Sequence, residues 1–105
     1  MNLFNFTEKL TERLTERKKQ MGLTYFDSYK IFITEGKKYF KVFKSEVKGE
    51  NISNGSIVAF IDKTTGDIFK PATYNTPAKH ARGCVLSAQD GMEAFTPDGF
   101  VRYLK

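Results

Sequence analysis

The chain has 105 residues, of which 40% are hydrophobic and 28% charged, and this balance is typical of one folded domain rather than of a disordered segment. Its net charge of +5 favours contact with phosphate, acidic protein or anionic lipid, but it carries no information about the fold. The single cysteine, Cys84, excludes an internal disulfide, and no apolar run approaches the roughly 20 residues that a membrane helix needs.

Residues 3–21 are predicted to form an amphipathic helix. Their apolar side chains recur at intervals of three, four and seven and fall on one helical face: Leu3, Phe6, Leu10, Leu14 and Met21. Asn2 or Asn5 can cap the start, and Asn5 with Glu8 has the outline of a capping box. Gly22 is suited to end the helix in the left-handed conformation.

A repeat with a period of four runs through this helix over residues 7–17 and separates its charges into two stripes. The stripes are Glu8, Glu12 and Glu16, and Lys9, Arg13 and Arg17. Like charges four residues apart destabilise a helix by about 0.2–0.5 kcal/mol per pair. Tertiary packing must therefore stabilise the helix, or a partner must neutralise one of the stripes. The alternative to a functional role is that the charged stripes simply form the solvent-exposed face of the helix.

Residues 29–34 and 38–44 are rich in strand formers and are predicted to form a hairpin around a tight turn at Glu35-Gly36. Alternate residues of a strand face opposite ways, so the lysines of the second segment cannot all lie on one side: Lys38, Lys41 and Lys44. We expect the helix to cover one face of the sheet and the other face to be partly wet and basic.

A second hairpin is predicted over residues 56–70. The nearly all-apolar residues 56–61 indicate a central strand, and a turn over residues 62–66 follows, in which Gly66 can take the left-handed conformation. Residues 67–70 return as the partner strand, and Pro71 ends its hydrogen-bond ladder because proline has no N–H to donate.

The last third of the chain is less regular. Thr76-Pro77 has the chemistry of a helix start, so residues 78–82 are expected to form one or two helical turns that stop at Gly83. A short strand is expected over residues 84–87. A turn at residues 96–99 precedes a terminal strand over residues 100–104.

Taken in order, the predicted elements indicate an α+β fold in a single domain over residues 1–105. The N-terminal amphipathic helix packs on an antiparallel sheet of about four to five strands.

The residue inventory predicts no catalytic residue, no metal site and no cofactor. Neither a GxxxxGK[ST] loop nor a GxGxxG turn is present, and one histidine with one cysteine cannot supply the roughly four ligands of a structural zinc site. Cys84 lies four residues after His80, but an orienting group and an oxyanion hole are not identifiable. Asp62 and Asp67 flank a turn, where aspartate more often accepts hydrogen bonds from backbone donors than binds magnesium.

Residues 69–83 contain no acidic residue and combine cations with an aromatic ring. We predict that they bind nucleic acid through Lys70, Tyr74, Lys79, His80 and Arg82. Lysine and arginine suit phosphates, and a tyrosine offers a face on which an unstacked base can lie, so the mixture favours a single strand. Backbone amides at a helix start near Thr76 could add an anion site. The alternative is a structural loop whose tyrosine packs on the sheet and whose cations are solvated.

Residues 62–72 and 76–83 resemble a family of small uncharacterised bacteriophage proteins, whose shared signature is a DKxTGD hairpin followed by a PAKxxRG loop. The likeness covers about a quarter of the chain. It implies a phage-encoded accessory protein that acts in the host cytoplasm or is carried in the virion. The N-terminus lacks the apolar centre of a signal peptide, which also favours the cytoplasm.

Three functional hypotheses follow. The first is a nonenzymatic phage accessory protein that binds DNA or RNA through the basic loop, assisted by strand lysines. The second is a protein-interaction module, either a small virion component or an inhibitor of a host enzyme or defence system, which the charge-striped helix favours. The third is an enzyme acting on nucleic acid, which rests only on His80, Asp62 and Asp67. No membrane partner is expected, and the oligomeric state stays open.

Overall fold

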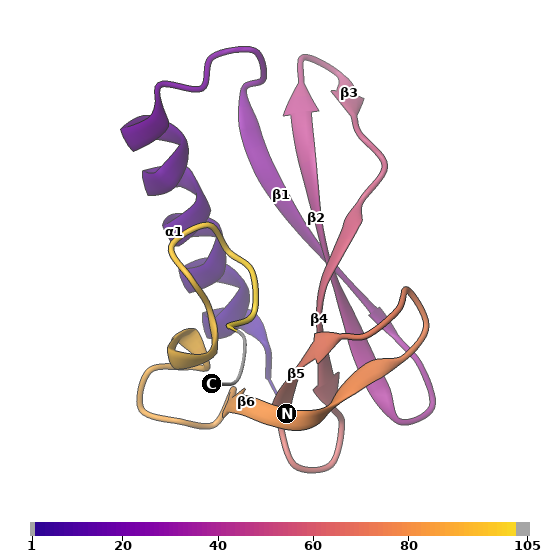
Figure 1. Ribbon diagram of the computed structural model, residues 1–105. Helices are drawn as coiled ribbons and strands as arrows, with labels where there is room; N and C mark the ends of the chain where they lie inside the picture. Colours follow the sequence, from indigo (N-terminus) through magenta and orange to yellow (C-terminus); the bar gives the residue numbers. More distant parts are fainter. Residues whose placement is uncertain (1, 103–105) are drawn as a thin grey trace.

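A helix and an antiparallel sheet form the two layers of the chain in the computed structural model, which describes residues 2–102 (Figure 1). In chain order the elements are α1 (Phe4–Met21), β1 (Ser28–Glu35), β2 (Tyr39–Lys48), β3 (Asn51–Ile52), β4 (Ser56–Asp62), β5 (Asp67–Pro71), β6 (Pro77–Cys84) and the 3-10 helix η1 (Met92–Ala94). The strand order is β1-β2-β4-β5-β6, and the short β3 pairs only with β2. The predicted α+β fold, both hairpins and the central position of residues 56–61 are confirmed.

The helix begins and ends much as its sequence indicates. Asn2 Oδ1 accepts a hydrogen bond of 2.8 Å from the Phe4 N–H, while the N-cap residue Leu3 has no side-chain cap. The capping box predicted from Asn5 is therefore wrong, because Asn5 already lies inside the first turn. At the other end Gly22 takes φ 65°, and the Leu23 N–H donates to the Lys18 carbonyl at 3.1 Å.

The basic stripe of α1 binds the C-terminal segment of the chain, which comprises the described residues after β6, 85–102. Arg13 donates to the Met92 and Phe95 carbonyl oxygens at 2.9 and 3.0 Å. Two ion pairs of 2.6 Å lie on either side of this contact, Lys9 with Asp90 and Arg17 with Asp98. The like charges of the stripe are thus offset by tertiary contacts, which is the first of the two possibilities that the repeat raises.

The core lies between one face of the sheet, α1 and the C-terminal segment. Its buried side chains are Phe6, Leu10 and Leu14 from the helix, Ile31, Val42, Val58, Ala59, Ile61 and Ile68 from the sheet, and Val85, Met92, Ala94, Phe95 and Val101 from the end of the chain. The rings of Phe6 and Phe95 lie 5.7 Å apart, so helix and C-terminal segment meet directly. Within residues 2–102, no helix has both the length and the apolar character needed to cross a bilayer.

Residues 78–82 do not form the predicted helical turns but belong to β6, which pairs with β5. So short a helix has little stability of its own, whereas pairing satisfies the backbone groups along the free edge of β5. Gly83 also favours the strand. A Cβ there would lie 2.9 Å from the Ala94 Cβ, so only glycine lets β6 approach η1 this closely.

The remaining two strand predictions are also corrected. Cys84 is the last residue of β6, and the chain then turns, with the Ser87 N–H donating to the Cys84 carbonyl at 3.1 Å. The turn at residues 96–99 is confirmed by a 3.0 Å hydrogen bond from the Gly99 N–H to the Thr96 carbonyl. The predicted terminal strand is reduced to a single bridge between Phe95 and Val101, and its residues 103–104 lie outside the described part of the chain.

Candidate nucleic-acid interface

The face of the sheet that points away from α1 carries lysines and aromatic rings in alternation. The register places Phe32 beside Phe43 and Thr34 beside Lys41 across β1 and β2, and Lys41 beside Phe60 across β2 and β4. Phe60 in turn lies beside Phe69 of β5. We call this surface the open face, and its residues are Lys30, Phe32, Thr34, Tyr39, Lys41, Phe43, Phe60 and Phe69. The alternation follows from strand geometry, because the core residues of β1 and β2 occupy the intervening positions.

The loop between β5 and β6 folds over part of the open face (Figure 1). The Tyr74 ring lies 5.8 Å from the Phe43 ring, and the Lys41 ammonium lies 4.9 Å from the centre of the Tyr74 ring. Lys41 also donates a 2.9 Å hydrogen bond to Asn75 Oδ1. A 2.6 Å contact between the Thr73 and Thr76 hydroxyls closes the loop. Tyr74 remains 58% exposed, so more than half of its surface is accessible to another molecule.

A cleft of about 310 Å³ lies beside this cluster, between the loop and the β1–β2 turn. Phe60 contributes to its wall and is only 1% exposed, and the Tyr39 ring packs edge-on against Phe60 at 5.8 Å. Lys37, Lys38 and Lys41 line the same cleft, so aromatic surface and positive charge are brought to one place.

The nearby carboxylates are engaged by other groups. Glu35 forms an ion pair of 2.6 Å with Lys63. Asp62 accepts hydrogen bonds from the backbone N–H groups of Thr65 and Thr64 at 3.0 and 2.8 Å, and these hold the pKa of Asp62 below its ordinary value. The aspartate at this hairpin end therefore satisfies backbone donors, as expected. The lysines of the cleft keep a surplus of positive charge.

A model of DUF7717, a family of unknown function, matches residues 1–103. The chain belongs to the DUF7717 family. No curated protein and no solved structure matches it. Membership of a family of unknown function assigns no activity to the chain. A function for this DUF7717 chain must therefore be inferred from the chemistry of the open face.

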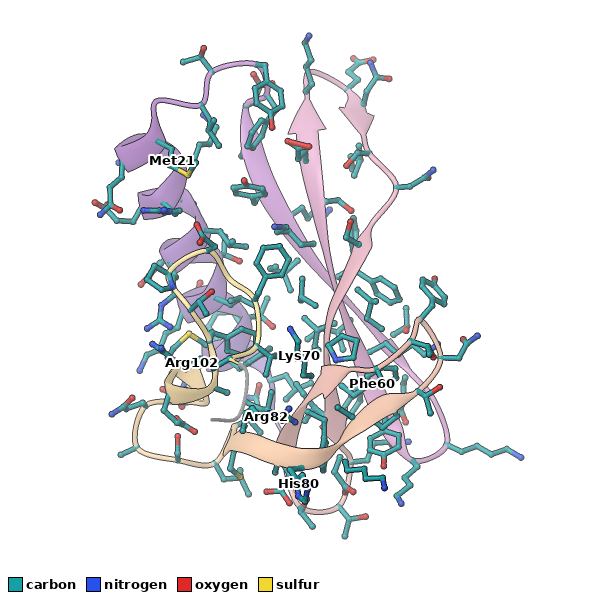
Figure 2. The ribbon with its side chains drawn as sticks, viewed as in Figure 1. Met21, Phe60, Lys70, His80, Arg82 and Arg102 are labelled. Carbon is teal, nitrogen blue, oxygen red and sulfur yellow. The ribbon has the colours of Figure 1, made fainter. Side chains whose placement is uncertain are left out.

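The DUF7717 structure brings only part of the predicted site to the open face. Tyr74 lies there, against Phe43 and Lys41. Lys70 points to the opposite, helix-covered side, where its ammonium donates to the Val101 carbonyl at 3.3 Å (Figure 2). Lys79 and His80 are exposed on the edge strand β6, and Figure 2 shows His80 at the lower end of the sheet.

Arg82 of the DUF7717 chain is half-buried on β6, and its guanidinium donates to the His80 carbonyl. It is therefore partly occupied with its own strand. Residues 76–78 are not a helix start, so the helix-terminal anion site suggested at Thr76 is absent from the described structure.

Two lysine–phenylalanine pairs in the DUF7717 sequence indicate the open face, but the predicted set of binding residues did not include them. Lys30 with Phe32, and Lys41 with Phe43, place a cation and a ring at alternate positions of neighbouring strands. Lys30 and Lys41 also lie over rings, at 5.1 Å from Phe32 and 5.8 Å from Phe60. Strand lysines were expected to assist binding, but the rings beside them were not recognised as part of the surface.

In the described part of the DUF7717 chain, the side chains of Cys84 and His80 form no hydrogen bond with each other. Cys84 is half-buried, with its thiol 3.4 Å from the Thr65 carbonyl oxygen. His80 is exposed on the preceding part of β6. Among residues 2–102 no group of three or more His, Cys, Asp or Glu side chains could hold a metal ion.

Proposed function

We propose that this protein binds single-stranded nucleic acid on the open face of its sheet, without acting on it enzymatically. The observation that carries the proposal is the cluster of Lys41, Phe43 and Tyr74, in which an ammonium and two rings share one accessible surface. Single strands are bound by positively charged grooves whose aromatic side chains stack on successive bases.

The exposed ring favours a single strand over a duplex. A base can stack on Tyr74 only if its own face is free, and in a duplex both faces are covered by neighbouring base pairs. The lysines of the cleft stand within the same surface as the ring and would meet the phosphates on either side of such a base.

The bacteriophage resemblance of residues 62–72 and 76–83 extends the proposal to a biological setting. We infer a phage accessory protein that meets its nucleic acid in the host cytoplasm or in the virion. The setting rests on that sequence likeness, whereas the binding surface rests on the geometry of the open face.

A role as a protein-interaction module is the second candidate function, and the surface of α1 is the observation that favours it. The basic stripe of α1 is occupied by the C-terminal segment, while the acidic stripe remains exposed: Glu8, Glu12 and Glu16. Phe4 lies exposed near the start of this surface. A virion or host protein with a basic surface would complement it.

Binding of a fluorescein-labelled oligothymidylate and oligouridylate, measured by anisotropy over a range of salt concentrations, tests the proposed function. Each phosphate contact on a single strand contributes about 0.7 to the slope of log K against log salt. The double variant Lys30→Gln with Lys41→Gln should therefore lower the slope by about 1.4. Two exposed ionic contacts contribute about 0.2–1 kcal/mol each, which corresponds to a roughly 2- to 30-fold weaker affinity.

The double variant Lys19→Gln with Lys48→Gln is the matched control. Both lysines are exposed and lie outside the open face, and replacing them lowers the net charge by the same amount. Equal losses in the two double variants would mean that general charge, not the open face, attracts the strand. Absence of salt-dependent binding by the unmodified protein would overturn the proposal itself.

A further inference from the structure

A second cavity, of about 350 Å³, lies on the other side of the sheet from the open face. Lys44 and Glu46 of β2 line it, together with Tyr25, Tyr29 and Asn54. Lys44 pairs with the core residue Ile31 and Glu46 pairs with Tyr29, so both side chains point to the side that α1 covers. The cavity is within the size range of small-molecule sites in proteins.

Lys44 is a half-buried cation with aromatic neighbours, and in the described structure no carboxylate lies within ion-pair distance of its ammonium. Its ammonium lies 5.3 Å from the centre of the Tyr29 ring and 4.4 Å from that of Phe100. Burial lowers the pKa of Lys44, and the negative charges of Glu46 and Asp98 partly oppose this effect. Among the described residues the Lys44 ammonium forms neither a hydrogen bond nor an ion pair, so its N–H donors are available to a ligand.

Glu46 is the complementary group, two residues further along the same strand. Its Oε2 atom is buried without a hydrogen-bond partner in the described structure. The Tyr25 hydroxyl hydrogen-bonds to the carboxylate, and this contact raises the pKa of Tyr25. The backbone fixes the rim of the cavity here, because the Glu46 N–H donates to Ser53 Oγ at 2.8 Å and the Ser53 N–H returns to the Glu46 carbonyl at 2.9 Å.

Two opposite charges thus line one cavity and attract each other at a distance, but they form no ion pair. Removing a charge or a carboxylate oxygen from water without a partner is unfavourable, and a molecule that satisfies both groups would recover that free energy. Such a molecule needs an anionic end for Lys44 and a cationic donor for Glu46.

We propose that this cavity binds a small zwitterion, with its carboxylate at Lys44 and its ammonium group at Glu46. The site is distinct from the proposed nucleic-acid interface, because Lys41 and Lys44 point to opposite faces of β2. A polyanion would satisfy Lys44 but would be repelled by Glu46, so nucleic acid is not the expected occupant.

A series of ω-amino acids tests the proposal, since β-alanine, γ-aminobutyrate and ε-aminocaproate differ only in the separation of their charges. Each is titrated into the full chain while the amide signals of residues 25–29 and 53–56 are followed by NMR. At least one member should give saturable shifts, and butyrate and butylamine, which carry one charge each, should bind about tenfold or more weakly.

Lys44→Met and Glu46→Gln keep the side-chain shapes and should each weaken binding of that amino acid by about tenfold or more, whereas Lys19→Met on α1 should not. The amide spectrum of each variant reports whether it is folded, and either folded variant alone is a sufficient test. No saturable binding by any member of the series would overturn the proposal, as would butyrate or butylamine binding as tightly as the zwitterion. The result is independent of whether oligonucleotides bind.

Discussion

Replacing Phe95 with alanine is expected to destabilise the fold by about 3–5 kcal/mol. Phe95 is 0% exposed, its ring lies 5.7 Å from that of Phe6, and its carbonyl accepts one of the hydrogen bonds from Arg13. Removal of the ring leaves a cavity between α1 and the C-terminal segment. Domains of this size have total stabilities of about 5–15 kcal/mol, so the loss would be a large part of the whole.

Urea unfolding followed by circular dichroism measures this change, with Leu86→Ala as the control. Leu86 belongs to the same C-terminal segment but is 66% exposed, and its truncation should alter the free energy of unfolding by no more than about 0.5 kcal/mol. Equal stability of the two variants would show that the C-terminal segment is not part of the core.

Tyr74→Ala is expected to weaken binding of a single-stranded oligonucleotide by about 1–3 kcal/mol, or roughly 5- to 150-fold, if one base stacks on this ring. The same variant should leave the free energy of unfolding nearly unchanged, because the ring is 58% exposed and belongs to no buried cluster of the core. Anisotropy with labelled oligothymidylate measures the affinity.

Tyr25→Ala is the matched control for this loss. Tyr25 is exposed to a similar extent, 62% against 58%, but it lies in the connection between α1 and β1, beside Glu46 and away from the open face. An equal loss of affinity in both variants would contradict a specific stacking role for Tyr74.

The parts of the fold that could be predicted are those fixed by local sequence. The helix over residues 3–21 has its own apolar spacing and its own terminating glycine, Gly22. Each of the two hairpins has its strand formers and its turn in one continuous stretch, and Gly66 takes the expected left-handed φ of 81°. These signals need no knowledge of distant residues.

The elements that were wrong depend on contacts across the whole chain. Residues 78–82 have a plausible helix start, but the free edge of β5 and the close approach of Gly83 to η1 decide for a strand. The C-terminal segment has little regular structure and is positioned by the basic stripe of α1, above all by Arg13. No local pattern indicates which carbonyls that arginine meets.

The candidate site was only partly predictable for the same reason. The composition of residues 69–83 predicted a binding site there. However, alternate residues of a strand point to opposite faces, so Lys70 points to the core side of the sheet. Tyr74 belongs to the following loop, which places its ring on the open face. The lysine and phenylalanine pairs of β1 and β2 were visible in the sequence. Their importance depends on which face α1 covers.

Mapping of amide chemical shifts during titration with a short oligothymidylate is the most direct measurement of where a nucleic acid binds. Saturable shifts are expected in β1, in β2 and in the loop over residues 72–76, with α1 unaffected. Shifts confined to α1 would favour the helix as the interaction surface, and shifts confined to the β6 edge would favour Lys79 and His80. Either pattern, or no shifts at all, would contradict binding on the open face.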